Sequence, residues 1–565
     1  VTLRYTPHAA NELSNFRVGD IVILYPYTPG TKPNATQTMV LRASIARIQA
    51  EQITLHLRNP QGDARIFSFY KNACWAIEHD LFDSSFTTLY RGMHALLSTP
   101  VERQELLLLQ RPPRVNGNRQ LRGDYGAFNS LALRVKQAEE LFLLIGPPGT
   151  GKTSYGLVNT LKEQLLEPNT NVILMSYTNR AVDEICSKLE EEQIDYLRLG
   201  SHLSSAEAYH AHLLSERAGQ CAKLTDVEAL IKHTQVFVGT TSAFNAQLSL
   251  FDVKQFDLAI IDEASQILEP HLVGLLSAHN KRGMAIRKVV MIGDHKQLPA
   301  VVQQDEKDSR VDDPLLHEIG LTNCRLSLFE RLLKRYRHDP AVTYLLTKQG
   351  RMHPAIADFP NRHFYQGQLE PVPLPHQQRQ LEASCEAEGM TALLQGRRVA
   401  FIHVPLPTDS PSDKVNLPEA VLIAQTVAAI YHMRPKRFNP LSTVGIIVPY
   451  RNQIATIRRC LESYGIPLLQ QVTIDTVERY QGSQRDYILY GFTIQRCYQL
   501  NFLTNNVFEE DGCLIDRKLN VAMTRAREHL YLFGNAPLLS LNTTFRELIE
   551  EYSIHSTFNL KQRNE

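Results

Sequence analysis

The chain has 565 residues, of which 43% are hydrophobic and 21% charged, and its formal net charge at pH 7 is +1. This composition is typical of a soluble globular protein of about three to four domains and excludes a largely disordered chain. A near-neutral charge means that any contact with nucleic acid must come from a local track of positive side chains. No apolar run reaches the roughly 18 residues that a bilayer span requires, and the N-terminus lacks the pattern of a signal peptide.

The first 82 residues predict short strands joined by turns, at 20–25, 53–58, 65–69 and 74–77. Several strands in so few residues indicate a small barrel or sandwich, which we predict to be a small β-barrel accessory domain. A helical stalk and linker is predicted over 83–124. Asp83 and Ser84 suit the N-cap of its first helix, Pro100 begins a second helix, and the prolines at 112 and 113 are expected to end it.

From about residue 125, near-continuous apolar strands alternate with amphipathic helices. Such strands belong to parallel sheets covered on both faces, so the predicted fold class is α/β with two tandem domains. The expected strands are 141–145, 172–175, 236–238, 258–261 and 289–292, then 399–402, 444–448, 472–474, 487–490 and 530–533. We place the first domain at 125–335 with a helical insertion at about 195–233, the second at 336–545, and a C-terminal tail at 546–565.

The eight cysteines include no C-x-x-C pair and stand at positions 74, 186, 221, 324, 385, 460, 497 and 513. This spacing argues against structural zinc, an iron–sulfur cluster held within the chain and a disulfide framework. We therefore expect a reducing, cytoplasmic (intracellular) setting. The chain opens at Val1 rather than Met, so we also expect a fragment whose upstream domains are missing.

A glycine-rich segment directly follows the predicted strand at 141–145. Residues 146–153 match the phosphate-loop pattern G-x-x-x-x-G-K-[ST]. In such a loop the backbone N–H groups wrap the phosphates, the lysine reaches the β- and γ-phosphates, and the hydroxyl ligates Mg²⁺. A chance glycine-rich turn is the alternative, and the flanking strand and helix argue against it. The predicted ATP-binding residues are Gly146, Pro147, Pro148, Gly149, Thr150, Gly151, Lys152 and Thr153.

The predicted strand at 258–261 ends in two carboxylates, Asp262 and Glu263. Strand ends line the ligand crevice of an open α/β sheet. Asp262 is predicted to hold Mg²⁺ with Thr153, and Glu263 to orient and deprotonate the attacking water. An Asp-Glu pair after a strand is more often a solvated turn, but a phosphate loop in the same sheet favours hydrolysis.

A third strand ends in Gly-Asp-His-Lys-Gln-Leu-Pro, in which Gln297 is suited to sense the γ-phosphate. With these three motifs in this order, the chain resembles the superfamily 1 helicases. Further family motifs have counterparts: Q-x-R-M-H-P at 349–354, P-Y-x-x-Q at 449–453, D-T-V…Q-G at 475–482 and N-V-A-x-T-R-A-R at 520–527. The resemblance is to subgroup 1B, which includes the nonsense-mediated-decay RNA helicase and the eukaryotic replication nuclease-helicase, and it covers about residues 129–535.

The resemblance implies two RecA-like domains with ATP and Mg²⁺ between them. It also implies that Arg351 and Arg525 reach the γ-phosphate from the second domain as arginine fingers, so that hydrolysis requires closure of the cleft. For nucleic acid, a single strand of DNA or RNA, it points to residues that hold a backbone without reading bases. These are Thr178, Asn179, Arg180, Thr240, Thr241, Ser242, Tyr450 and Thr476. Helix caps and a core tyrosine remain the alternatives for the Thr, Ser and Tyr residues.

The chain departs from the family pattern at the base end of the nucleotide site. The usual Gln upstream of the phosphate loop is absent, and Asn129 is the candidate substitute. The aromatic residue that often precedes the motif arginine is Gly350, and the usual Glu after Q-G is Gln484, which we keep as an ATP-binding residue. The triphosphate contacts are complete, so we expect weak selectivity for the base.

These motifs predict an ATP-dependent helicase or translocase on single strands, acting as a monomer and moving 5′→3′ if the subgroup's polarity holds. The alternative is a nucleotide-gated binding or remodelling ATPase without unwinding activity, as part of a larger protein. A metabolic P-loop kinase is a weaker hypothesis, because such an enzyme has no use for Arg351 and Arg525 in a second domain.

Overall fold

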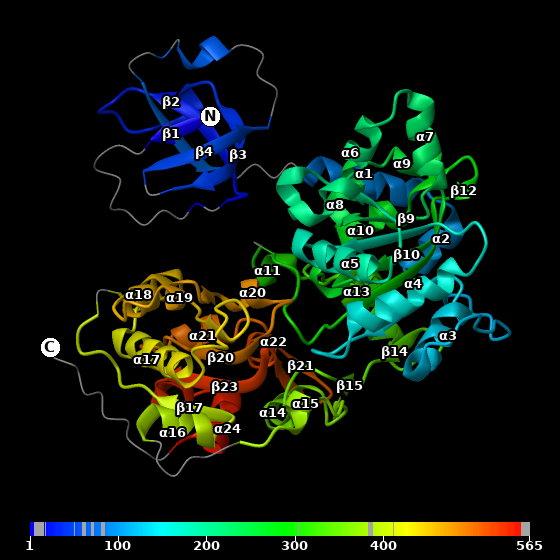
Figure 1. Cartoon of the computed structure of the whole chain (residues 1–565). Helices are drawn as coiled ribbons and strands as arrows, with labels where there is room; N and C mark the ends of the chain where they lie inside the picture. The colour runs from blue at the N-terminus through cyan, green and yellow to red at the C-terminus, as the bar shows by residue number, and fades with distance from the viewer. Residues whose placement is uncertain are drawn as a thin grey trace.

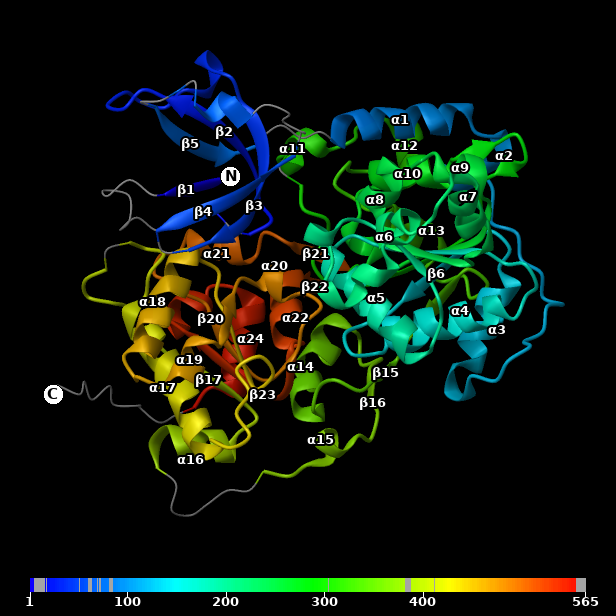
Figure 2. The same cartoon turned by 45° about the horizontal axis from the view of Figure 1, so that its top comes forward.

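The structure is a computed structural model. It describes residues 1–4, 16, 18–49, 51–58, 64–68, 70, 73–80, 85–302, 304–381, 388–410 and 412–554. Figures 1 and 2 show an N-terminal β-sheet and two α/β units, whose helices cover their sheets. No helix in the described part of the chain combines the length and apolar character needed to cross a membrane.

The N-terminal sheet is antiparallel, with strand order β1-β4-β3-β2-β5. Its strands are β1 (Thr2–Arg4), β2 (Ile21–Tyr27), β3 (Leu41–Ile48), β4 (Gln52–Leu57) and β5 (Cys74–His79). Alternate residues of β2 to β4 form its apolar core, among them Val22, Leu24 and Ile45. Among the described residues the edge strands β1 and β5 do not pair with each other, so the small β-barrel that we predicted is not confirmed.

One predicted N-terminal strand is wrong. Residues 64–67 form a 3₁₀ turn, η2 (Ala64–Phe67), instead of extended chain. The backbone N–H and the hydroxyl of Ser68 both donate to the carbonyl of Arg65, at 2.8 Å each. Such a side-chain bond gives the backbone an alternative to a sheet ladder, which a short apolar pattern does not reveal.

Two helices, α1 (Ser85–Ser98) and α2 (Val101–Leu107), connect this sheet to the first α/β unit. Helix α1 packs on α10 (Glu269–Leu276) where Gly92 meets Gly274, and a Cβ on Gly274 would lie 2.5 Å from the Gly92 Cα. Only glycine permits this crossing. Helix α2 ends five residues before Pro112, so the prolines do not end it as predicted, and the predicted cap at 83–84 lies outside the described residues.

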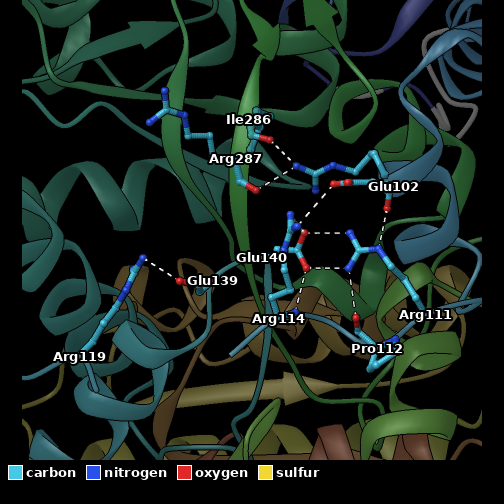
Figure 3. Close-up of polar contacts among 10 residues, drawn as sticks. Glu102, Arg111, Pro112, Arg114, Arg119, Glu139, Glu140, Ile286 and Arg287 are labelled. Carbon is cyan, nitrogen blue, oxygen red and sulfur yellow. Dashed lines mark hydrogen bonds and ion pairs between the residues drawn. The ribbon is translucent and has the colours of Figure 1, made fainter. Parts of the chain in front are cut away.

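The segment after α2 is fixed to the first unit by a charged cluster on Glu140 (Figure 3). Arg111 donates two hydrogen bonds to the Glu140 carboxylate, at 2.8 and 2.9 Å, and Arg114 donates through Nη2 at 2.7 Å and through its backbone N–H at 2.9 Å. Burial alone would raise the pKa of Glu140, but these two arginines lower it to about 2. Arg103 adds bonds of 2.6 and 2.9 Å to the carbonyls of Ile286 and Arg287.

The first α/β unit is a seven-stranded parallel sheet of order β14-β6-β13-β10-β7-β9-β8. Its strands are β6 (Leu141–Ile145), β7 (Val172–Ser176), β8 (Leu197–Leu199), β9 (Val236–Thr240), β10 (Phe256–Ile261), β13 (Ile286–Gly293) and β14 (Thr343–Leu345); β11 (His279–Asn280) and β12 (Gly283–Met284) form a small hairpin. Its helices are α3 (Asn129–Gln137), α4 (Val158–Leu165), α5 (Asn179–Glu191), α6 (Leu214–Gly219), α7 (Leu224–His233), α8 (Thr241–Ala246), α9 (Leu250–Val253), α10, α11 (Glu306–Ser309), α12 (Pro314–Glu318) and α13 (Leu328–Tyr336). Because β14 pairs with β6, this unit extends beyond the boundary that we predicted at residue 335.

The second α/β unit is a five-stranded parallel sheet of order β17-β23-β20-β18-β19. Its strands are β17 (Val399–His403), β18 (Val444–Ile447), β19 (Thr473–Asp475), β20 (Arg485–Gly491) and β23 (Ala526–Gly534), with two small pairs, β15 (Lys348–Gln349) with β16 (Glu370–Pro371) and β21 (Val507–Glu510) with β22 (Cys513–Asp516). Its helices are α14 (Pro354–Phe364), α15 (Pro375–Gln378), α16 (Gly389–Gly396), α17 (Leu417–Met433), α18 (Arg451–Glu462), α19 (Pro467–Gln470), α20 (Val477–Tyr480), α21 (Gln499–Leu503), α22 (Arg517–Met523), α23 (Ala536–Leu539) and α24 (Thr543–Tyr552). Leu548 and Ile549 of α24 belong to the core of this unit, so the tail predicted from residue 546 begins inside a packed helix.

Candidate nucleotide site and nucleic-acid interface

The phosphate loop follows the buried strand β6 and leads into a helical segment. Gly149 and Gly151 have φ of 75° and 79°, a backbone conformation that glycine adopts without strain. A Cβ on Gly149 would lie 2.4 Å from the Cβ of Arg351, so glycine here also lets the second unit approach the loop. The ammonium of Lys152 donates to the Gly146 carbonyl at 2.8 Å.

The end of β10 places two carboxylates beside this loop. Asp262 is buried and accepts a hydrogen bond of 2.6 Å from the Thr153 hydroxyl. Burial and the neighbouring Glu263 raise the pKa of Asp262 to about 7. Glu263 has a φ of 53°, and its carboxylate accepts a bond of 3.0 Å from the side-chain amide of Gln266. One hydroxyl and one carboxylate in contact form the hard oxygen donor set that Mg²⁺ prefers, so Thr153 and Asp262 fit the predicted ion.

The predicted sensor and one predicted finger touch across the two units. β13 lies between β6 and β10, and the loop that follows it carries Asp294 and Gln297. Nε2 of Gln297 donates to Asp294 at 2.8 Å, and Oε1 of Gln297 accepts from Nη2 of Arg525 at 2.9 Å. Arg525 is 1% exposed, and burial together with the charge of Arg351 lowers its pKa to about 9.

The second predicted finger, Arg351, lies at the same cleft. Its Nε donates to Oε1 of Gln484 at 3.0 Å, and Nη1 donates to the Thr524 carbonyl at 3.3 Å. The backbones of the two units also meet here, since the N–H of Gly350 in the second unit donates to the carbonyl of Gly149 in the first at 2.9 Å. Burial lowers the pKa of Arg351.

These residues surround a cavity of about 290 Å³, which we call the nucleotide cavity. Both units line it, so a triphosphate in it would contact groups from both. Its lining residues are Pro147, Gly149, Thr150, Gly151, Lys152, Thr153, Ser154, Tyr155, Glu184, Glu263, Gln297, Gly350, Arg351, Leu374, Gly482, Gln484 and Arg525.

The base end of the cavity differs from the family expectation. Asn129 does not line it: its amide donates to Asp124 and accepts from the Tyr125 N–H, each at 2.7 Å. Beside Gly350, the side chain of Leu374 occupies the space, with its Cδ1 3.1 Å from where a Cβ would stand. Tyr155 stacks on Phe128 with ring centroids 5.0 Å apart, and Tyr155 as a whole is 53% exposed.

Sequence reasoning missed several lining residues. Glu184 on α5 faces the cavity, and burial together with Glu263 raises its pKa. Tyr155 and Leu374 add apolar surface at the base end. A helix-face Glu and an isolated Leu carry no sequence signal of their own, whereas an aromatic residue two positions after the phosphate loop could have been considered.

The predicted nucleic-acid residues of the first unit follow the carboxyl ends of two neighbouring strands, β7 and β9. β7 and β9 pair in parallel, with Ser176 opposite Thr240, so the loops after these strands are neighbours. Thr178 caps α5 by accepting from the Ala181 N–H at 3.2 Å, and Thr240 caps α8 by accepting from the Ala243 N–H at 3.1 Å. Exposed residues at this edge include Asn179, Arg180 and Ser242, whereas Thr241 is buried.

In the second unit the predicted residues are less accessible. Tyr450 stacks on Phe502 with centroids 5.3 Å apart, and its hydroxyl accepts from the amide of Gln499 at 3.3 Å. Thr476 precedes α20, and its N–H donates to Asp475 at 2.9 Å. The half-buried Tyr450 is thus engaged within its own unit.

Comparisons with known proteins agree with the motifs. Two protein-family models, both described as AAA domain, match residues 129–226 with 215–305 and residues 324–537. The chain is 30% identical over 441 residues to the human DNA replication ATP-dependent helicase/nuclease DNA2, and 29% identical over 443 residues to that of Xenopus laevis, in both cases over 74% of the chain. It is 27% identical over 457 residues to regulator of nonsense transcripts 1 of Dictyostelium discoideum, over 73% of the chain.

The chain spans 38%, 37% and 31% of the length of the frog, human and Dictyostelium relatives. Among solved structures, an arterivirus nonstructural protein 10 (helicase) matches with a TM-score of 0.38 and 13% identity, covering 92% of this chain and 77% of that one. The two family models and the similarity to the DNA2 and nonsense-transcript relatives, together with the phosphate loop and the Asp-Glu pair, show that the chain belongs to the superfamily 1 helicases.

Proposed function

We propose that this chain is an ATP-dependent helicase or translocase that acts on single-stranded nucleic acid with Mg²⁺ as cofactor. In this proposal the two α/β units are RecA-like domains, and the N-terminal sheet on α1 and α2 is an accessory module. The observation that carries the proposal is the hydrogen bond between Arg525 and Gln297, which joins the two units at the nucleotide cavity. A guanidinium supplied by the far unit makes hydrolysis depend on closure, and closure is what moves a strand.

The proposed roles follow from position at the cavity and, for Asp262, from its hydrogen bond with Thr153. Lys152 binds the β- and γ-phosphates, Thr153 and Asp262 hold Mg²⁺, and Glu263 takes the proton of the attacking water. When bound, Mg²⁺ neutralises charge on the β- and γ-oxygens. Gln297 orients Arg525 toward the γ-phosphate, and the edge formed by the loops after β7 and β9 holds the strand's backbone.

The names of the relatives, one given for DNA replication and another for nonsense transcripts, make both DNA and RNA candidate substrates. The direction of movement is proposed from the resemblance to subgroup 1B. We propose 5′→3′ movement. Duplexes with a 5′ or a 3′ tail, made of DNA and of RNA, test this: displacement should require ATP and a 5′ tail. Displacement only from 3′-tailed duplexes would reverse the polarity. Strand-stimulated hydrolysis without displacement from any duplex would favour the alternative, a nucleotide-gated remodelling ATPase.

A further inference from the structure

A second cavity, of about 250 Å³, lies between the two units and is lined by three arginines. Arg180 comes from the first turn of α5 in the first unit, and Arg479 and Arg485 come from α20 and β20 in the second. Figures 1 and 2 show α5 and α20 on opposite sides of the boundary between the units. We call this the arginine cavity; neither Arg479 nor Arg485 is among the residues that the sequence motifs predicted.

The arginine cavity is separate from the nucleotide cavity, although the two share one strand end. Gln484 lines the nucleotide cavity, where it accepts a hydrogen bond from Arg351. Arg485, the next residue, begins β20 and lines the arginine cavity instead. Successive side chains of an extended chain point to opposite sides, so this strand end separates the two cavities.

Three arginines and a single carboxylate, that of Asp475, line the arginine cavity, so its lining carries a net positive charge. Asp475 lies 4.0 Å from Arg479, and Arg180 forms no ion pair with any described residue. Arg485 donates to the Gln484 carbonyl at 2.7 Å and to the Thr473 hydroxyl at 3.3 Å, and its Nε is buried without a hydrogen-bond partner. Burial lowers the pKa of Arg485, and the positive charge of Arg180 across the boundary lowers it further.

We propose that the arginine cavity binds one phosphodiester group of the single strand, an inference that rests on the proposed function. A guanidinium group can donate two parallel hydrogen bonds to the oxygens of one phosphate. The N-terminus of the 13-residue helix α5 adds partial positive charge. A phosphate between Arg180 and Arg485 removes their mutual repulsion. Because the arginines come from both units, the strand binds this site most tightly when the units are closed.

The test is the salt dependence of strand affinity. Fluorescein-labelled 20-nucleotide DNA and RNA are titrated with the full chain, bound to a non-hydrolysable ATP analogue, at several salt concentrations. For Arg485→Gln the slope of log affinity against log salt should become shallower by about 0.7, the value for one phosphate contact on a single strand. Arg485→Lys keeps the charge and should keep the slope. The double substitution of Arg180→Gln and Arg485→Gln should change the slope no more than either single substitution does, because both arginines hold the same phosphate.

Arg437→Gln is the matched control, because Arg437 is an exposed arginine of the second unit that does not line the arginine cavity. It should leave the slope unchanged. Unchanged slope and affinity for Arg485→Gln, with wild-type protein that binds the strand, would overturn the proposal. The proposal would also be overturned if Arg485→Gln bound the ATP analogue more weakly in the absence of strand but kept its affinity for the strand. The arginine cavity would then hold a phosphate of the nucleotide. Wild-type protein that hydrolyses ATP but binds no strand would instead refute the proposed function.

Discussion

Lys152 and Glu263 line the same cavity, and the proposed function gives them different steps of hydrolysis. In that proposal the positive charge of Lys152 contacts the phosphates before the reaction, whereas Glu263 acts on the attacking water. Lys152→Ala should therefore weaken nucleotide binding and turnover together. Glu263→Gln should bind ATP normally and reduce kcat by about 10²-fold or more. Equilibrium binding of a fluorescent ATP analogue and steady-state hydrolysis measure both effects, and near wild-type turnover of Glu263→Gln would contradict the assignment of the base.

Arg525 is the buried residue whose removal should affect chemistry alone. Arg525→Ala should reduce kcat by about 10³-fold, as loss of an arginine finger does. Its affinity for a single strand without nucleotide should stay close to that of the wild type, because its side chain faces Gln297 and the nucleotide cavity. Anisotropy with labelled strand and a hydrolysis assay give the two readings. A large loss of strand binding with normal hydrolysis would place Arg525 at the wrong surface.

The base end of the nucleotide cavity has apolar surface but lacks the glutamine that usually hydrogen-bonds to the polar edge of the adenine. Asn129 is bonded to Asp124 and Tyr125, so its amide is already occupied. Tyr155 would stack on any base and Leu374 would pack against any base, because neither contact requires a particular polar edge. We expect GTP to be hydrolysed within about tenfold of ATP, which corresponds to about 1.4 kcal/mol. Steady-state rates with four nucleotides and saturating strand decide this, and a preference for ATP above about a hundredfold would show an edge contact elsewhere.

At the scale of elements, the linkage of the α1–α2 segment to the first sheet depends on Glu140. Its pKa of about 2 in the folded chain is below its ordinary value of 4.5. A lowered pKa means that the carboxylate stabilises the fold above about pH 4.5, and that this stabilisation is lost as the pH falls toward 2. Glu140→Gln should lower the free energy of unfolding by about 2 kcal/mol at pH 7, an estimate reduced because Arg114 is exposed to water.

Urea titrations followed by circular dichroism at pH 7 and near pH 3 test this expectation. The gap between wild type and Glu140→Gln should shrink at the lower pH. Glu139→Gln is the control, because its partner Arg119 and Glu139 itself are 45% and 30% exposed, and surface pairs contribute little. Equal effects of the two substitutions at pH 7 would mean that the cluster does not hold the segment.

The positions of strands were predictable from the sequence where a strand is a continuous run of apolar residues. The ten predicted strands of the two parallel sheets are all present, because a strand buried on both faces needs a continuous apolar run. Short or half-exposed elements were harder: β3 was missed, and residues 64–67 form a turn set by one Ser68 hydroxyl. The predicted domain boundaries were wrong at β14 and α24. Strand β14 pairs with β6, and α24 packs in the core of the second unit, so both depend on contacts with distant segments.

At the scale of the whole molecule, the two units are joined by a buried hydrogen-bonded chain. The hydroxyl of Tyr365, at the end of α14, donates to Asp294 at 2.8 Å and accepts from Asn520 at 2.9 Å. Asp294 also accepts from Gln297, which in turn accepts from Arg525. The position of Gln297 in the first unit therefore depends on a tyrosine of the second.

Tyr365→Phe removes the hydroxyl and keeps the ring. It should lower strand-stimulated kcat roughly tenfold with little change in KM for ATP, since a lost buried hydrogen bond is worth about 1–3 kcal/mol. Tyr336→Phe is the control, because its hydroxyl bonds to the Arg111 carbonyl at 3.3 Å, away from the nucleotide cavity. If both variants lose the same activity, the effect is one of general stability and not of communication between the units.

The sequence alone determined the phosphate-binding loop, the carboxylate pair and the class of both sheets, because each depends on residues adjacent in the chain. The tertiary structure decided which distant groups meet: Arg525 contacts a glutamine 228 residues earlier, and Arg180 approaches Arg485 from another unit. It also showed that Asn129 is bonded elsewhere and that Leu374 occupies the space beside Gly350. Such contacts depend on how two sheets are placed against each other, and no local pattern of residue types encodes that placement.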